Sequence, residues 1–213
     1  MTGGRVAIVA CGDDALRILC GEGDIRISFA AHLAKADCWM EVVPGKRDVT
    51  VAFDPHRERM DDAQARLADA LAAFVPKAAE HAAQHILRAE FGGASGPDLA
   101  ALAASLGLAE ADIVAAVERS PLSVDMLGFT PGFAYLKGLD PNLASTRLAN
   151  PRARVAAGSI GLITGQIGLY ALEGPGGWPI IGRVLTPLFD RSAANPFLLQ
   201  PGARVLLGRA GPA

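Results

Sequence analysis

Two patterns of hydrophobic and polar positions divide the chain near residue 120. Before that point, apolar residues alternate with polar or small ones, as at Val49, Val51 and Phe53, and a period of two predicts half-buried strands. Other stretches repeat apolar residues at spacings of three and four, which predicts helices. Beyond residue 120, short apolar runs are separated by glycine and proline turns. That pattern indicates an all-β barrel or sandwich.

Residues 1–90 are predicted to form an N-terminal α+β domain. In its second helix, Leu67, Leu71 and Phe74 share one face, and Asp61 is expected to cap the N-terminus. The expected elements are strands at 6–9 and 15–19, a helix at 25–36, strands at 38–43 and 48–53, the Asp61 helix and a last strand at 82–89. Their order matches β-α-β-β-α-β, the ferredoxin-like arrangement of a sheet with helices on one face.

Residues 91–120 are interpreted as a linker with two short helices, which we expect to bridge the domains. The first helix ends at Gly107, because glycine is a common C-terminal stop, and the second runs from Glu110 to about Arg119. The barrel domain then covers 121–213, and Pro201-Gly202 predicts a tight turn into its closing strand. The predicted fold class is α+β in two domains.

Composition narrows the possible classes of protein. A net charge of −2 with 51% hydrophobic residues excludes a disordered chain and leaves no global basic field for nucleic acid. Three cysteines without a C-x-x-C pair favour a reducing compartment. No apolar run approaches the roughly 20 residues that span a bilayer, and the N-terminus lacks the order of a signal peptide. We expect a cytoplasmic protein that binds neither nucleic acid nor membrane.

Common catalytic motifs are missing from the sequence. There is no G-x-x-x-x-G-K-[ST] phosphate loop, no zinc-type spacing of His and Cys, and no G-x-S-x-G nucleophile turn, so we predict no metal site. The segment from Gly128 to Arg183 is rich in glycine and proline and also contains several arginines. These arginines are the remaining charged candidates, because their planar forks suit carboxylate or phosphate. The predicted catalytic cations are Arg147, Arg152 and Arg183. The alternative is that they are surface charges or pair with acidic residues, which we favour for Arg154.

The same segment supplies the candidate substrate contacts, since loops of defined shape on a rigid scaffold commonly carry sites. Trp178, after two glycines, is the preferred ligand wall or partner anchor, although aromatic residues there can equally be core. Gln166 and Tyr170 can bond a substrate amide or satisfy buried backbone. The full predicted set is Gly128, Phe129, Pro131, Gly132, Phe133, Tyr135, Gln166, Tyr170, Pro175, Gly176, Gly177 and Trp178.

These motifs also occur in a specific order. GFTPGFAYL is followed by PRARVAAGS, GQIGLY, GPGGWPIIGR, PLFD and LLQPG, and upstream stand VVPGKRDVTVAFDP and FGGASGPDLAALAASLGL. In this order the chain resembles the family of 5-oxoprolinase B subunits, also called allophanate hydrolase subunit 1, which includes a sporulation kinase inhibitor. The likeness covers nearly the whole chain and implies a ferredoxin-like domain followed by a cyclophilin-like β-barrel. Arg119 stands where the family usually carries histidine.

The resemblance implies one component of an ATP-dependent 5-oxoprolinase, which converts 5-oxoproline to glutamate. The expected partners are the A and C subunits of that enzyme, the latter of the allophanate hydrolase subunit 2 type. ATP is expected to bind to the complex, and this chain is expected to be inactive alone. Arg147, Arg152 and Arg183 would stabilise the developing oxyanion. Two alternatives share the motifs: half of a biotin-dependent urea or allophanate-type carboxyltransferase, and a regulatory inhibitor of a histidine kinase.

Overall fold

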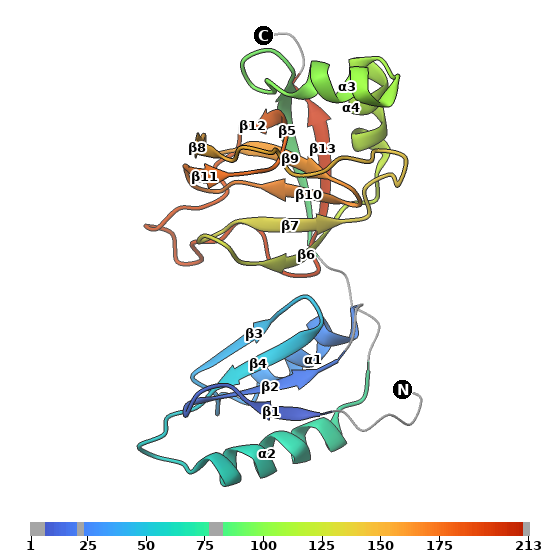
Figure 1. Ribbon diagram of the computed structural model, residues 1–213. Coiled ribbons are helices and arrows are strands. Elements are labelled where there is room, and N and C mark those ends of the chain that lie inside the picture. Colours follow the sequence, from blue (N-terminus) through green and yellow to red (C-terminus); the bar gives the residue numbers. More distant parts are fainter. Residues whose placement is uncertain (1–6, 21–23, 77–82, 211–213) are drawn as a thin grey trace. The chain divides into compact units, whose positions relative to one another are not determined.

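The chain folds into two compact units, Met1–His81 and Ala82–Ala213. The computed structural model describes residues 7–20, 24–76 and 83–210. Both helices and strands occur, and the second unit contains a closed barrel, so the predicted α+β class and the predicted barrel are confirmed (Figure 1).

The N-terminal unit is a four-stranded antiparallel sheet with two helices. Its elements are β1 (Ile8–Ala10), β2 (Ala15–Leu19), α1 (Ile25–Ala34), β3 (Glu41–Pro44), β4 (Asp48–Ala52) and α2 (Met60–Ala73). Alternate residues of β2 and β4, such as Leu16 and Val51, are fully buried and share one core with Phe29 of α1 and Leu67 of α2. Both helices therefore cover the same face of the sheet. Asp61 lies inside the first turn of α2 and makes no side-chain cap, which corrects the expected start of this helix.

The strand order of this sheet is β1-β2-β4-β3. β4 is inserted between β2 and β3, which flank α1 in the chain, and this is the pattern of a split β-α-β unit. The edge next to β2 is occupied by β1. The prediction that residues 82–89 supply the last strand of this sheet is wrong, because that segment pairs within the other unit.

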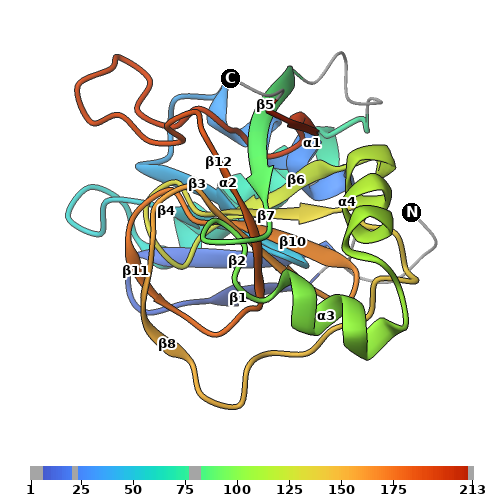
Figure 2. The same cartoon turned by 90° about the horizontal axis from the view of Figure 1, so that it is seen from above.

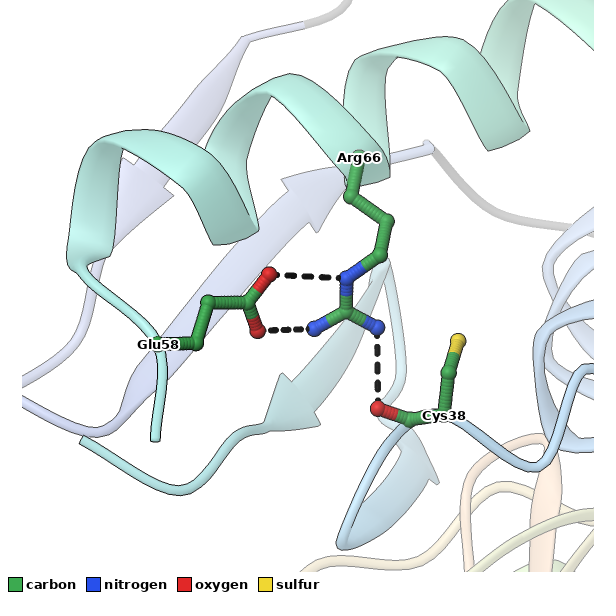
Figure 3. Close-up of polar contacts among 3 residues, drawn as sticks. All are labelled: Cys38, Glu58 and Arg66. Carbon is green, nitrogen blue, oxygen red and sulfur yellow. Dashed lines mark hydrogen bonds and ion pairs between the residues drawn. The ribbon is translucent and has the colours of Figure 1, made fainter. Parts of the chain in front are cut away.

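A single arginine of α2, Arg66, links the helix to two loops of the N-terminal unit (Figure 3). Arg66 donates from Nε to Glu58 Oε1 at 3.0 Å, from a second nitrogen to Glu58 Oε2, and to the Cys38 carbonyl at 2.9 Å. Its guanidinium carbon also lies 3.7 Å from the centre of the Trp39 ring. A planar fork can satisfy all of these contacts at once, so Arg66 joins the segments on either side of β3 and β4 to the helix.

The C-terminal unit is a barrel of seven strands. Its elements are β5 (Gln84–Phe91), α3 (Leu99–Leu106), α4 (Glu110–Arg119), β6 (Ser123–Leu127), β7 (Ala134–Lys137), β8 (Arg152–Val155), β9 (Ser159–Ile163), β10 (Gln166–Leu169), β11 (Gly174–Gly176), β12 (Ile180–Val184) and β13 (Arg204–Arg209). The closed order is β10-β7-β6-β13-β5-β12-β9, and β8 and β11 form a separate two-stranded sheet. β13 pairs with β5 in parallel and follows the predicted turn at Pro201-Gly202.

The two short helices belong to the barrel unit. α3 ends at Gly107 in the left-handed conformation (φ 65°), as predicted, and α4 has its predicted bounds. Leu102, Ile113 and Val117 lie in the same buried cluster as the inward side chains of β5 and β13, so the interpretation of residues 91–120 as a separate linker is corrected. In the described ranges no single helix is long and apolar enough to cross a membrane; α3 and α4 qualify only as a pair bent by 95° (Figure 2).

Candidate functional site

Four aromatic side chains from separate parts of the barrel unit meet in one cluster. Phe133 lies just before β7 and makes edge contacts with Tyr135, Tyr170 and Trp178 at ring-centroid distances of 4.7, 4.9 and 6.2 Å. Tyr135 and Trp178 are 5.9 Å apart. Edge-to-face packing is the favoured geometry for aromatic pairs. The structure thus brings together four of the predicted substrate contacts.

Burial separates these four residues into two groups. Phe133, Tyr170 and Trp178 are 2%, 2% and 4% exposed, whereas Tyr135 is only partly buried. Trp178 is therefore a packed core residue of the barrel unit rather than an exposed wall.

The pKa values of both tyrosine hydroxyls are raised. Burial is the largest cause for Tyr135, and the positive charge of Arg147 opposes it. For Tyr170, burial is again the largest cause of the raised pKa, and it is opposed by the backbone of Trp178 and by the charges of Arg147 and Arg152. Both hydroxyls stay protonated at neutral pH and can donate hydrogen bonds.

Residues 128–133 form a double turn between β6 and β7. Phe133 N–H donates to the Thr130 carbonyl at 3.0 Å, and Gly132 at φ 76° supplies the left-handed third position of a type II turn after Pro131. Thr130 N–H donates to the Gly128 carbonyl at 2.9 Å, which closes a tighter turn centred on Phe129. Phe129 has φ 69°, a conformation that is strained for a bulky side chain, and is 59% exposed. Strain of this kind is concentrated at functional sites.

An open hollow of about 370 Å³ lies along the double turn. It is lined by Leu127, Gly128, Phe129, Thr130, Pro131, Gly132 and Phe197. Phe197 comes from the long connection between β12 and β13 and was not among the predicted contacts; its ring lies 5.5 Å from that of Phe189. Phe129 in turn packs edge-on against Phe133 at 5.4 Å, so the hollow adjoins the aromatic cluster.

Arg147 lies in a loop that is fastened on both sides. Ser145 and Thr164 exchange three hydrogen bonds of 2.9 to 3.0 Å, and Leu148 N–H donates to the Gly177 carbonyl at 2.7 Å. Arg147 itself is exposed, and within residues 7–20, 24–76 and 83–210 no carboxylate pairs with it. The loop therefore presents a cation that is unpaired within the described residues, and its charge acts on the tyrosine hydroxyls.

The other three arginines between Gly128 and Arg183 are hydrogen-bonded or ion-paired within the chain. Arg152 makes a two-bond ion pair with Asp98 at 2.8 and 2.7 Å. Arg183 donates from Nε to the Ala157 carbonyl at 3.0 Å, and Arg154 pairs with Glu173 at 3.1 Å, which is the alternative that the sequence favoured for it. The three predicted catalytic cations thus differ in their bonding: Arg152 is ion-paired, Arg183 is hydrogen-bonded through Nε, and Arg147 has no ion pair within the described residues.

The remaining predicted contacts lie around these groups. Gly176 is close to Tyr170, because a Cβ added there would lie 2.5 Å from the hydroxyl oxygen, and Gly177 faces Pro151. Pro175 precedes Gly176 in β11 and is exposed. Gln166 begins β10, opposite Lys137 of β7, and is partly buried.

A family model described as "Carboxyltransferase domain, subdomain C and D" matches residues 6–199. The chain belongs to this family. A protein from Haemophilus influenzae, named as the B subunit of 5-oxoprolinase, is 35% identical over 84% of this chain and 83% of its own length. A protein of the same name from Escherichia coli O157:H7 is 46% identical over 54% of this chain, and that match spans about half (53%) of the E. coli protein.

Solved structures of other proteins share the fold. The protein TTHA0988 has a TM-score of 0.82 and 28% identity; the match covers 94% of this chain but only 40% of that one. Urea amidolyase from Kluyveromyces lactis has a TM-score of 0.74 at 19% identity and covers 96% of this chain and 15% of its own, a likeness that shows the fold alone. In both, the same fold is part of a much longer chain.

ATP does not fit the glycine segment of this carboxyltransferase-domain chain. Gly161–Gly168 spans the β9-β10 hairpin, with the turn at Thr164-Gly165, and no helix follows to receive phosphate on its N-terminus. In the described part of the chain, no group of three or more His, Cys, Asp or Glu side chains is arranged to hold a metal ion.

Asp98, like Phe197, was not among the residues predicted from the sequence. It precedes α3, where an aspartate is ordinarily interpreted as a helix cap, and it makes no side-chain cap. Its partners lie 54 and 82 residues away. The only signal in the sequence was its place in the upstream stretch that carries the family likeness.

Proposed function

We propose that this chain is one component of an ATP-dependent 5-oxoprolinase and acts with subunits of the A and C type. The observation that carries the proposal is the match to the H. influenzae 5-oxoprolinase B subunit over 83% of that protein. We further propose that the chain is cytoplasmic, and that it has no turnover alone because its unpaired cation and exposed loop form only part of a site.

The proposed reaction needs a stabilised oxyanion. Hydrolysis of the 5-oxoproline ring adds water across the C–N bond: the carbonyl carbon gains the oxygen and the nitrogen gains a proton. Negative charge develops on the carbonyl oxygen during attack, and positioned donors lower this barrier. The substrate also carries a carboxylate at neutral pH, which is a second anionic group for an arginine to bind.

Roles follow from the state of each side chain. Arg147, exposed and unpaired within the described ranges, is the proposed anion-binding cation, and the partly buried Tyr135 hydroxyl is the proposed hydrogen-bond donor. The double turn with Phe129 is the proposed wall facing the substrate or a partner protein. Arg183 keeps its two terminal nitrogens for a ligand, since only its Nε is hydrogen-bonded among the residues that the structure describes.

A carboxyltransferase half-site is the second candidate, because the matching family is described as a carboxyltransferase domain. Transfer of a carboxyl group to an amide or urea nitrogen also develops anionic charge that a guanidinium can stabilise. The two candidates differ in the nucleotide requirement and in the product. Only the first releases ADP when 5-oxoproline is added to the assembled subunits.

The test is ADP release on adding 5-oxoproline to this chain mixed with subunits of the A and C type, each omitted in turn. Turnover that requires all three supports the proposal. Turnover by this chain alone contradicts its dependence on partners. A stable complex without turnover favours the carboxyltransferase half-site, and failure to bind either partner favours a regulatory binding protein such as a kinase inhibitor.

A further inference from the structure

Asp98 is hydrogen-bonded to two residues that are far from it in the sequence, Arg152 and Ile180. Its Oδ1 and Oδ2 accept from the two terminal nitrogens of Arg152 at 2.7 and 2.8 Å, and Oδ2 also accepts from the Ile180 N–H at 2.6 Å. The Asp98 N–H donates back to the Ile180 carbonyl at 2.9 Å. The carboxylate thus fastens the start of α3 to β8 and β12 at the same point.

The Asp98–Arg152 pair is better shielded than the other arginine pair on β8. The side chains are 16% and 34% exposed, whereas those of Glu173 and Arg154 are 51% and 79% exposed. Two parallel charge-assisted hydrogen bonds fix the orientation of both groups, and partial burial strengthens them. Arg152 therefore holds structure in place and does not present a free fork to a ligand.

The loop that Arg152 holds is the one that carries Arg147. Arg152 pairs with Gly176 in the β8-β11 sheet, and the neighbouring Pro151 contacts the position of a Cβ on Gly177 at 3.5 Å. Leu148, next to Arg147, donates to the Gly177 carbonyl. The Asp98–Arg152 ion pair, called the clamp below, and the hydrogen bond from Leu148 to Gly177 thus restrain the residues that follow Arg147.

We propose that Asp98 is a positioning residue that acts through Arg152 to hold Arg147 facing an anionic ligand. Arg147 contacts the ligand; Asp98 and Arg152 do not. This division of roles rests on the proposed function for the identity of the ligand, the carboxylate or developing oxyanion of a small cyclic amide. The clamp itself rests on the hydrogen bonds alone, so it can be tested without turnover.

The first test labels the full chain with phenylglyoxal, a dicarbonyl reagent for free guanidinium groups, and measures each arginine by mass spectrometry. In the wild type, Arg152 should react about tenfold or more slowly than Arg147, because a hydrogen-bonded charged pair must open first. In Asp98→Asn, Arg152 should react as fast as Arg147. Glu173→Gln, which removes the acid from the more exposed pair, should leave the Arg152 rate unchanged. Equal labelling of Arg152 in wild type and Asp98→Asn overturns the proposal.

The second test measures kcat and KM for 5-oxoproline in the assembled complex. Arg147→Gln should lower kcat/KM by about 10²–10³-fold, and Asp98→Asn by up to about 10²-fold through misplacement. The double variant should be no slower than Arg147→Gln alone, because Asp98 acts through Arg147. Additive losses overturn the positioning role, as does a fall in thermal stability with kcat and KM intact. If the wild-type complex has no turnover, the proposed function fails and the labelling still decides the clamp.

Discussion

Replacing Gly168 by alanine should destabilise the barrel unit through the aromatic cluster. A Cβ at this position would lie 2.7 Å from Phe133 Cζ and 2.9 and 3.0 Å from two ring carbons of Trp178. Carbon atoms pack best at about 3.5–4.0 Å, so both rings would have to move by about 1 Å. They are 2% and 4% exposed and have no free space to enter. Overpacking of this kind costs about 1–3 kcal/mol.

The assay follows thermal unfolding by tryptophan fluorescence in a Trp39→Phe background, so that Trp178, the second of two tryptophans, reports the barrel unit alone. The cost above predicts a Tm lower by roughly 2–12 °C. Gly208→Ala is the matched control, since Gly208 is also a barrel-strand glycine and nothing lies within 4 Å of its added Cβ. That variant should stay within about 0.5 kcal/mol of the parent. Equal stability of the two variants would refute the packing argument.

Three further predictions concern the same region. Trp178→Ala should cost about 3–5 kcal/mol in unfolding free energy by denaturant titration, because a ring that is 4% exposed leaves a cavity; an unchanged free energy with lost ligand binding would show an exposed wall instead. Phe129→Asn should leave stability within about 1 kcal/mol, since asparagine tolerates φ 69°, while weakening binding of the partner proteins; unchanged complex formation and turnover would remove Phe129 from the site. Arg147→Gln should raise the tyrosinate titration midpoint, which only Tyr135 and Tyr170 supply, because a cation that favours the ionised hydroxyls is removed. Both pKa values are raised in the folded state, so their stabilising contribution is complete below pH about 10 and is lost as the pH rises through the folded pKa values; an unmoved midpoint contradicts the placement of Arg147.

Several elements were predictable because their signals are local. Gly107 ends α3 where a left-handed residue is needed, and Pro201-Gly202 turns the chain into β13. The short apolar runs after residue 120 became barrel strands, since alternation and turn residues act over a few neighbouring positions. The ordered motifs pointed to the right family, and the double turn they contain lines a hollow.

The sequence by itself determined the helices, most strands, the turns and the family of this protein, because those depend on neighbouring residues. Only the tertiary structure decided that β5 closes the barrel beside β13, since a strand alternates in the same way whichever sheet it joins. It also decided which arginine is left without an ion pair within the described residues. Arg147 and Arg152 are the same residue type in the same stretch of the sequence. Pairing with Asp98, 54 residues from Arg152, occupies Arg152, whereas Arg147 remains exposed. Long-range pairing depends on where the folded chain brings side chains together, and no local pattern records it.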